Sequence, residues 1–202
     1  MPNELSIGDL LKGISSESPA PGGGSVAALS GCFGAALVSM VCRLSIGKRK
    51  YKEVEDELKG VLYKAEILRK KLLDLSNKDI DAFRDVMSAL KIPEREEKRG
   101  NIQKAYKEAA NVPFEVAKKC LRVMELAEVA TLKGNKNAIT DSGVAALMAH
   151  SGLKGAVLNV KVNLKYIEDE QFNAEKVGGI ENLEKRAEEV LRTLMEKVES
   201  SL

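Results

Sequence analysis

Three consecutive glycines followed by a serine form the segment of this chain best suited to bind an anion. Gly22, Gly23, Gly24 and Ser25 follow Pro21 directly and lead into an uncharged helical pattern. Each glycine loses more backbone entropy on folding than another residue would, so the run implies that some group approaches the backbone closely. The first N–H groups of a helix are unpaired and attract anions. Two interpretations stay open: a ligand site at a helix start, or a tight crossing of two helices.

Aspartates supply the candidate acid–base groups. Asp79 lies beside Ile80 and Phe83, close to the apolar stripe of a helical pattern. A half-buried carboxyl group at that position would have the shifted pKa that proton transfer requires. Asp81 is more simply an exposed helix residue, and Asp141 could either act in catalysis or cap a helix start. Neither Asp79 nor Asp141 identifies a catalytic site by itself.

Two asparagines and a basic turn are the other polar groups of interest. Asn159 and Asn163 are one helical turn apart in an otherwise apolar segment. Because buried amides need partners, they either brace a neighbouring helix or meet a polar ligand. Lys48, Arg49 and Lys50 could receive an acidic substrate tail, or they could only complement a helix dipole.

The cysteines and the single histidine favour neither disulfides nor a metal site. Cys32, Cys42 and Cys120 are too few and too scattered for a disulfide framework, and His150 resembles a helix-end residue. No carboxylate cluster suggests a metal ligand set. The N-terminus lacks a basic segment followed by an apolar run, so no signal peptide is expected and the cytoplasm is the expected location.

Composition predicts one helical domain spanning residues 1–202. The chain is 44% hydrophobic but only 4% aromatic, without tryptophan, which suits helix packing better than a β-sandwich. The net charge of +2 comes from mixed charges along the chain and is not a nucleic-acid-binding pattern. The predicted fold is an all-α bundle with long antiparallel helices.

Apolar periodicity predicts where these helices lie. Pro113 should kink or break the pattern that contains it, and Thr140 or Asp141 should cap the helix that follows them. Alternating valines within 156–167 would also suit a strand, but the flanking patterns favour a helix. The predicted helices are 4–14, 24–44, 53–90, 94–132, a helix that includes 144–150, then 156–167 and 180–198.

The glycine run leads into a helix that must be weighed as a membrane span. Residues 26–42 are nearly all apolar or small, at the short end of a spanning segment. Serines interrupt the stretch and no aromatic belt flanks it, so a central helix surrounded by others is expected, with no membrane partner. Ala27, Gly31, Ala35 and Ser39 recur every four residues, and this small-residue stripe would let another backbone approach closely.

In their order along the chain, these motifs resemble the cyclodeaminase domain of formiminotransferase-cyclodeaminase and the stand-alone methenyltetrahydrofolate cyclohydrolases of the same family. The resemblance covers almost the whole chain. It rests on the run Pro19 to Ala28, on Gly47-Lys48-Arg49-Lys50-Tyr51, on Asp79-Ile80-Asp81-Ala82-Phe83, on Val112-Pro113, on Gly134-Asn135 with Asp141, and on Gly155-Ala156, Asn159-Val160 and Asn163-Leu164.

The resemblance implies an all-helical homodimer or larger assembly that binds a folate near subunit contacts. The folate is itself the substrate, so neither a metal nor an organic cofactor is expected. The favoured reaction is formiminotetrahydrofolate cyclodeamination; the alternatives are methenyltetrahydrofolate hydrolysis and a non-catalytic dimerisation domain. Asp79 and Asp141 would carry the proton transfers or hold the pterin. The remaining substrate-binding residues would be Pro21, Gly22, Gly23, Gly24, Ser25, Lys48, Asn135, Asn159 and Asn163.

Overall fold

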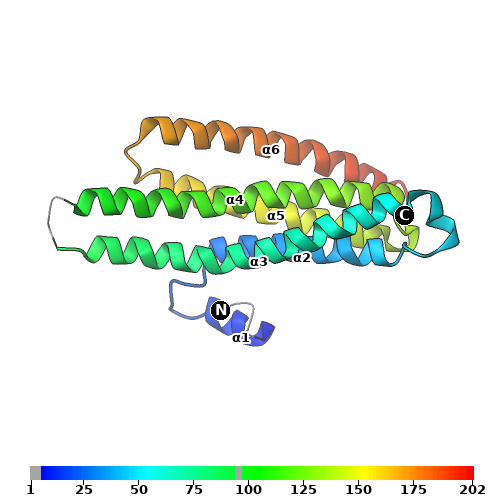
Figure 1. Ribbon diagram of the computed structural model, residues 1–202, viewed down its shortest axis with the longest axis horizontal. Helices are drawn as coiled ribbons and strands as arrows, with labels where there is room; N and C mark the ends of the chain where they lie inside the picture. Colours follow the sequence, from blue (N-terminus) through cyan, green and yellow to red (C-terminus); the bar gives the residue numbers. More distant parts are fainter. Residues whose placement is uncertain (1–5, 94–96) are drawn as a thin grey trace.

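The computed structural model describes residues 6–93 and 97–202, which form an elongated bundle of α-helices without any strand (Figure 1). The predicted all-α class is confirmed. The helices are α1 (Ile7–Ile14), α2 (Gly23–Arg43), the short 3-10 helix η1 (Arg49–Val54), α3 (Glu55–Lys91), α4 (Lys98–Lys133), the 3-10 helix η2 (Lys136–Ala138), α5 (Ile139–Leu164) and α6 (Glu170–Glu199).

Glycines let α2 and α5 pack at very short range. A Cβ atom on Gly34 would lie 2.7 Å from the Ala145 carbonyl oxygen, and one on Gly152 would lie 2.6 Å from that of Ala27. Neither side chain could be accommodated without moving a backbone, so both positions require glycine. The two contacts follow opposite chain directions, which makes the helices antiparallel. The small-residue side of α2 therefore has its close partner within the same chain.

The other long helices cover only part of this pair. α3 and α4 form a hairpin against α2, and α6 lies along α4 and α5 (Figure 1). The prediction that α2 is surrounded by helices is therefore wrong on one side, because no helix of the described residues covers it there. We call this uncovered side the α2/α5 face; its exposed apolar side chains are Val26, Phe33, Met40 and Leu44 on α2, and Val144, Leu147, Leu158 and Val162 on α5.

By length and composition, α2 is the one helix among residues 6–93 and 97–202 that could cross a membrane. Core helices of soluble proteins pass the same test, and 56% of its most apolar window is buried in the bundle. The exposed remainder is the α2 half of the α2/α5 face. A helix that is apolar all round is usually buried all round, so this face is suited to contact another apolar surface.

Pro113 neither breaks α4 nor divides it into two helices. It lies buried inside the continuous α4, although a proline there leaves the carbonyl four residues earlier without its helical N–H donor. That carbonyl belongs to Ala109, and the Nδ2 of Asn163 donates to it at 2.8 Å. A side chain of α5 thus replaces the missing helical hydrogen bond, so Asn163 does brace a neighbouring helix.

We expect Asn163→Ala to lower the free energy of unfolding by about 1–3 kcal/mol, because the Ala109 carbonyl would lose its donor. In a Pro113→Ala background the same change should cost less, since the restored backbone N–H can donate to Ala109. Urea unfolding of the wild type, both single variants and the double variant would measure this coupling. Additive effects would mean that the amide does not compensate for the proline.

Several helix ends differ from the predicted ones. α5 is one continuous helix, whereas the apolar patterns predicted two segments, 144–150 and 156–167. Gly152 and Gly155 lie within this helix, and their lack of a side chain lets Ala27 of α2 approach closely. Thr140 and Asp141 lie inside its first turn; Ala138 is its N-cap, and no side chain caps it. Asn135 instead caps η2 by accepting from the Asn137 N–H at 3.1 Å. Predicted positions 4–5 and 94–96 lie outside the described residues.

Candidate functional site

A cleft of about 290 Å³ lies where the start of α2 meets α3, α4 and α5, and we call it the Asp79 cleft. Its lining combines polar groups with large apolar side chains. The polar part comprises the glycine segment, Asp79, Asn159 and Asn163; the apolar part includes Phe83, Val86, Met87, Leu90, Tyr106 and Val162. A cleft in which a few polar groups converge beside large apolar side chains is typical of a small-molecule site.

A larger cavity of about 950 Å³ lies between the end of α3 and the beginning of α4. Its charged groups include Asp85 and Glu108 alongside Lys104 and Lys107. These opposite charges are mixed along an exposed groove. The smaller Asp79 cleft is the better candidate site, because its carboxyl group is both partly buried and held in place.

Asp79 reaches across from α3 to the beginning of α2. Its Oδ2 accepts a hydrogen bond from the Ser25 hydroxyl at 2.9 Å, and the Ser25 backbone N–H also donates to the carboxylate. Burial raises the pKa of Asp79, and the two hydrogen bonds from Ser25 offset part of that rise. A carboxyl group with a raised pKa in a cleft is suited to accept and return a proton.

The glycine run makes room for this carboxylate. A Cβ atom on Gly24 would lie 2.0 Å from the Asp79 Oδ1, so no other residue fits there without displacing Asp79. The group that approaches the glycine run at Gly24 is therefore the protein's own Asp79 carboxylate. Gly22 and Gly23 line the cleft beside it, and their role toward a ligand stays a prediction.

We expect Gly24→Ala to lower the melting temperature, because inserting a methyl group into a filled site typically costs about 1–3 kcal/mol. Gly60→Ala is the matched control: a Cβ atom on Gly60 of α3 meets no atom within 4 Å, and alanine favours the helix. Thermal unfolding followed by circular dichroism would compare the two. Equal melting temperatures for Gly24→Ala and the wild type would contradict the close contact.

The two asparagines present different groups to the cleft. The Nδ2 of Asn163 donates to both the Ala109 and Asn159 carbonyl oxygens, so only its Oδ1 acceptor is left for a ligand. The Nδ2 of Asn159 donates to the Gly155 carbonyl oxygen at 2.9 Å, which leaves one N–H and one oxygen. Both asparagines thus support backbone and still offer hydrogen-bonding groups to a bound molecule.

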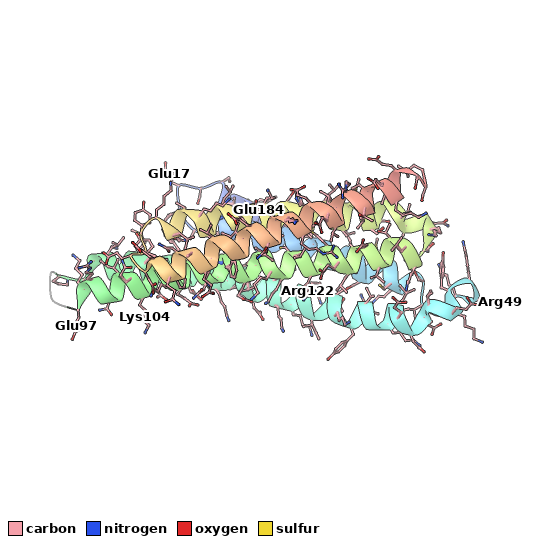
Figure 2. The ribbon with its side chains drawn as sticks, turned by 90° about the horizontal axis from the view of Figure 1, so that it is seen from above. Glu17, Arg49, Glu97, Lys104, Arg122 and Glu184 are labelled. Atoms are coloured by element: carbon pink, nitrogen blue, oxygen red, sulfur yellow. The ribbon has the colours of Figure 1, made fainter. Side chains whose placement is uncertain are left out.

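Lys48, Asn135 and Asp141 do not join this cleft within one chain. Asp141 precedes Asn159 by 18 residues on the continuous α5, which corresponds to about 27 Å of helix. Lys48 follows the far end of α2, and Asn135 lies there too, with its Oδ1 3.4 Å from the Tyr51 hydroxyl. Figure 2 shows this separation: Arg49, next to Lys48, is at one tip of the bundle, and Lys104 is toward the other. We call Lys48, Tyr51, Asn135 and Asp141 the Asn135 end.

Sequence reasoning missed most of the apolar lining. The sequence places Phe83 beside Asp79 without a binding role, and it assigns no binding role to Met87, Leu90, Tyr106 or Val162. The spacing Asp79, Phe83, Met87 and Leu90 was the available signal, since steps of three and four place all of them on one side of α3. Among the described residues, no group of three or more His, Cys, Asp or Glu side chains could hold a metal ion.

Comparisons with known proteins identify relatives from a single family. Over its full length, the chain is 44% identical to the methenyltetrahydrofolate cyclohydrolase of Methylorubrum extorquens, and the match covers 100% of both proteins. It is 32% identical to the formimidoyltransferase-cyclodeaminase of Gallus gallus, a match that covers 96% of this chain and 37% of that longer protein.

A solved structure agrees with these relatives. The crystal structure of a formiminotetrahydrofolate cyclodeaminase from Thermotoga maritima superposes with a TM-score of 0.93 at 32% identity, over 99% of this chain and 98% of that one. Residues 6–182 match the family described as formiminotransferase-cyclodeaminase. The chain with the Asp79 cleft therefore belongs to the formiminotransferase-cyclodeaminase family.

Proposed function

We propose that this protein is a methenyltetrahydrofolate cyclohydrolase, which adds water to 5,10-methenyltetrahydrofolate to give 10-formyltetrahydrofolate. The observation that carries this proposal is the 44% identity to the Methylorubrum extorquens cyclohydrolase along the entire length of both chains. The sequence alone favoured cyclodeamination. The full-length relative supports hydrolysis better, so hydrolysis is the first candidate and cyclodeamination the second.

The geometry of the Asp79 cleft suits this reaction. The methenyl carbon lies between N5 and N10 of the folate and carries positive charge, which a neighbouring carboxylate stabilises. Asp79 accepts a proton as a water molecule forms its bond to that carbon. The protonated carboxyl group then donates to N5 as the bond between N5 and the carbon breaks. The hydroxyl proton of the adduct goes to solvent, which leaves the formyl group on N10.

The other polar groups of the cleft would orient the substrate. The Asn163 Oδ1 can only accept, so it suits an N–H group on the pterin edge. Asn159 can donate and accept, and it lies close to the glycine segment: its Nδ2 would be 3.6 Å from a Cβ atom on Gly23. The Ser25 hydroxyl holds the Asp79 carboxylate and can turn to the Ser76 carbonyl oxygen, 3.0 Å away, when Asp79 is protonated.

The active unit of this proposal is a homodimer joined through the α2/α5 face. Two observations support it. Large apolar side chains are exposed on α2 and near both ends of α5, and Val162 belongs to the α2/α5 face as well as to the cleft lining. In a two-fold dimer formed across antiparallel helices, the Asn135 end of one copy can lie over the Asp79 cleft of the other. Lys48, Asn135 and Asp141 would then reach the same folate as Asp79.

Cyclodeamination of 5-formiminotetrahydrofolate is the second candidate, because the superposed Thermotoga maritima protein is described by that activity. Absorbance in the methenyl-folate band separates the two reactions. Accelerated loss of the band with 5,10-methenyltetrahydrofolate is the expected result. A rise of the band with 5-formiminotetrahydrofolate, accompanied by ammonia, would instead support the second candidate. If neither rate exceeds the uncatalysed one, the remaining candidate is the non-catalytic dimerisation domain.

A further inference from the structure

A pair of stacked tyrosines stands at the wall of the Asp79 cleft. Tyr106 lines the cleft from α4, and Tyr166 follows the end of α5. Their ring centroids are 4.8 Å apart and the ring planes differ by 18°. Tyr166 is not part of the cleft lining, so it supports Tyr106 from outside the cleft. Tyr166 is 55% exposed, whereas Tyr106 is half-buried and packs against the hydrophobic core.

The segment that carries Tyr166 is tied to the first turns of α4 by several polar contacts. Gln103 uses both ends of its amide: its Nε2 donates to the Tyr166 carbonyl oxygen at 3.0 Å, and its Oε1 accepts from the Glu168 N–H at 2.9 Å. Arg99 pairs with Glu168, and Lys107 pairs with Asp169 at 2.6 Å. These contacts hold the backbone next to an exposed aromatic ring.

Asn163 connects the two segments that carry the stacked tyrosines. Its Nδ2 donates a hydrogen bond to the carbonyl oxygen of Ala109, three residues after Tyr106 on α4. Its own carbonyl oxygen accepts a hydrogen bond from the Tyr166 N–H at 3.1 Å. One residue thus fixes the spacing between the helix that carries Tyr106 and the segment that carries Tyr166. A half-buried ring that is stacked on a second ring and held from two sides is suited to present a rigid flat surface to a ligand ring.

From this arrangement we infer that Tyr106 is the surface on which the p-aminobenzoyl ring of the folate stacks, and that Tyr166 is a positioning residue that holds Tyr106 in place. The inference rests on the proposed folate activity. Phe83, Met87 and Leu90 near Tyr106 offer no hydrogen-bonding group, so the polar edge of the pterin would be left unpaired there. The p-aminobenzoyl ring is apolar on both faces and is bonded directly to N10, which adjoins the reacting carbon.

Steady-state kinetics with 5,10-methenyltetrahydrofolate tests the role of Tyr166. We expect Tyr166→Ala to raise KM about tenfold, equivalent to about 1.4 kcal/mol, with kcat within about twofold of wild type. Tyr166→Phe keeps the ring and should restore the wild-type KM. Tyr63→Ala is the matched control, because Tyr63 is an exposed tyrosine of α3 outside the cleft. An unchanged KM for Tyr166→Ala, or an equal loss in Tyr166→Phe, would overturn the positioning role.

Competitive inhibition tests which ring is bound. Tyr166→Ala should weaken inhibition by p-aminobenzoylglutamate about tenfold and leave inhibition by 6-methyltetrahydropterin unchanged. The reverse pattern would overturn the assignment of the ring.

A binding measurement separates this inference from the proposed activity. The chain has no tryptophan, so Tyr106→Trp introduces a single reporter whose fluorescence a stacked ring quenches. Quenching by 5-formyltetrahydrofolate, with none in Tyr63→Trp, supports the stack even if the wild type turns over neither folate. Normal turnover by the wild type without any quenching in Tyr106→Trp would overturn the stack and leave the proposed activity standing.

Discussion

Asp79→Asn should lower kcat for the hydrolysis of 5,10-methenyltetrahydrofolate by about 10²–10⁴-fold, because the amide can neither take a proton from water nor return one to N5. KM should rise as well, because the neutral amide lacks the negative charge that attracts the positively charged substrate. Asp81→Asn is the matched control: it makes the same change two residues along α3, on an exposed side chain. Equal rates for Asp79→Asn and the wild type would exclude Asp79 as the proton carrier.

The same variant should be at least as stable as the wild type near pH 7. Burial raises the pKa of Asp79 above its ordinary value of 3.8, so the ionised group is disfavoured in the folded state. The stability from this raised pKa is complete below pH 3.8 and is lost as pH rises through the folded-state pKa. The asparagine amide is neutral, so it does not have the cost of burying an ionised group. Thermal melting at pH 7 would therefore show activity lost without stability lost, as for a group kept for function.

The pH profile should follow the same group. Only the ionised carboxylate can accept the proton of water, so kcat should rise with pH through the raised pKa of Asp79. Rates of the wild type, compared with the uncatalysed rates at each pH, would reveal this limb, and Asp79→Asn should lack it. The same limb in both proteins would assign it to another group.

Mixed dimers of two inactive variants should recover activity. We expect Asp79→Asn and Asp141→Asn to be inactive separately, because each breaks every site of its own dimer. A purified mixed dimer has one site with both changes and one site with neither, so it should turn over at about half of the wild-type rate. The two variants would be produced together with different affinity tags and isolated by both tags in turn.

The matched control is a mixed dimer of Asp79→Asn with Asp79→Ala. Both of its clefts are damaged, so it should stay inactive. If the Asp79→Asn and Asp141→Asn mixture also stays inactive, while each protein still elutes as a dimer in size-exclusion chromatography, then the Asn135 end does not serve the partner's cleft. Elution of the wild type as a monomer would contradict the dimer itself.

Local pattern was enough to predict the helices and part of the site. The periodicity of apolar residues predicted most of the long helices because one face of each is buried. The glycine run indicated a close approach at a helix start, but the approach expected there was that of a ligand or of a second backbone. The approaching group could not be identified from sequence. It comes from Asp79, 55 residues after Gly24, and only the packing of α3 against α2 brings them together.

The errors came from partners that are distant in sequence. Pro113 was expected to disrupt its helix because the Asn163 amide that replaces the missing bond lies 50 residues later. The apolar patterns divided α5 into two helices, yet Gly152 and Gly155 lie within one helix and let Ala27 of α2 approach closely. Asp141 and Asn135 were grouped with Asp79 through the family resemblance, while the length of α5 separates them within one chain.

The carboxylate of Asp79 also holds the first turn of α2, a local effect that is smaller than the cost of burying its charge. Gly22, the N-cap, has no side chain to accept from the first turn, so Asp79 serves as that acceptor from another helix. Each time the carboxylate takes a proton, the negative charge facing the positive end of the helix dipole disappears. The first turn of α2 should then open more often, and the amide of Ser25 should exchange its hydrogen faster in Asp79→Asn than in the wild type. Protonation of Asp79 during the proposed reaction is therefore coupled to local opening of the glycine segment that lines the cleft.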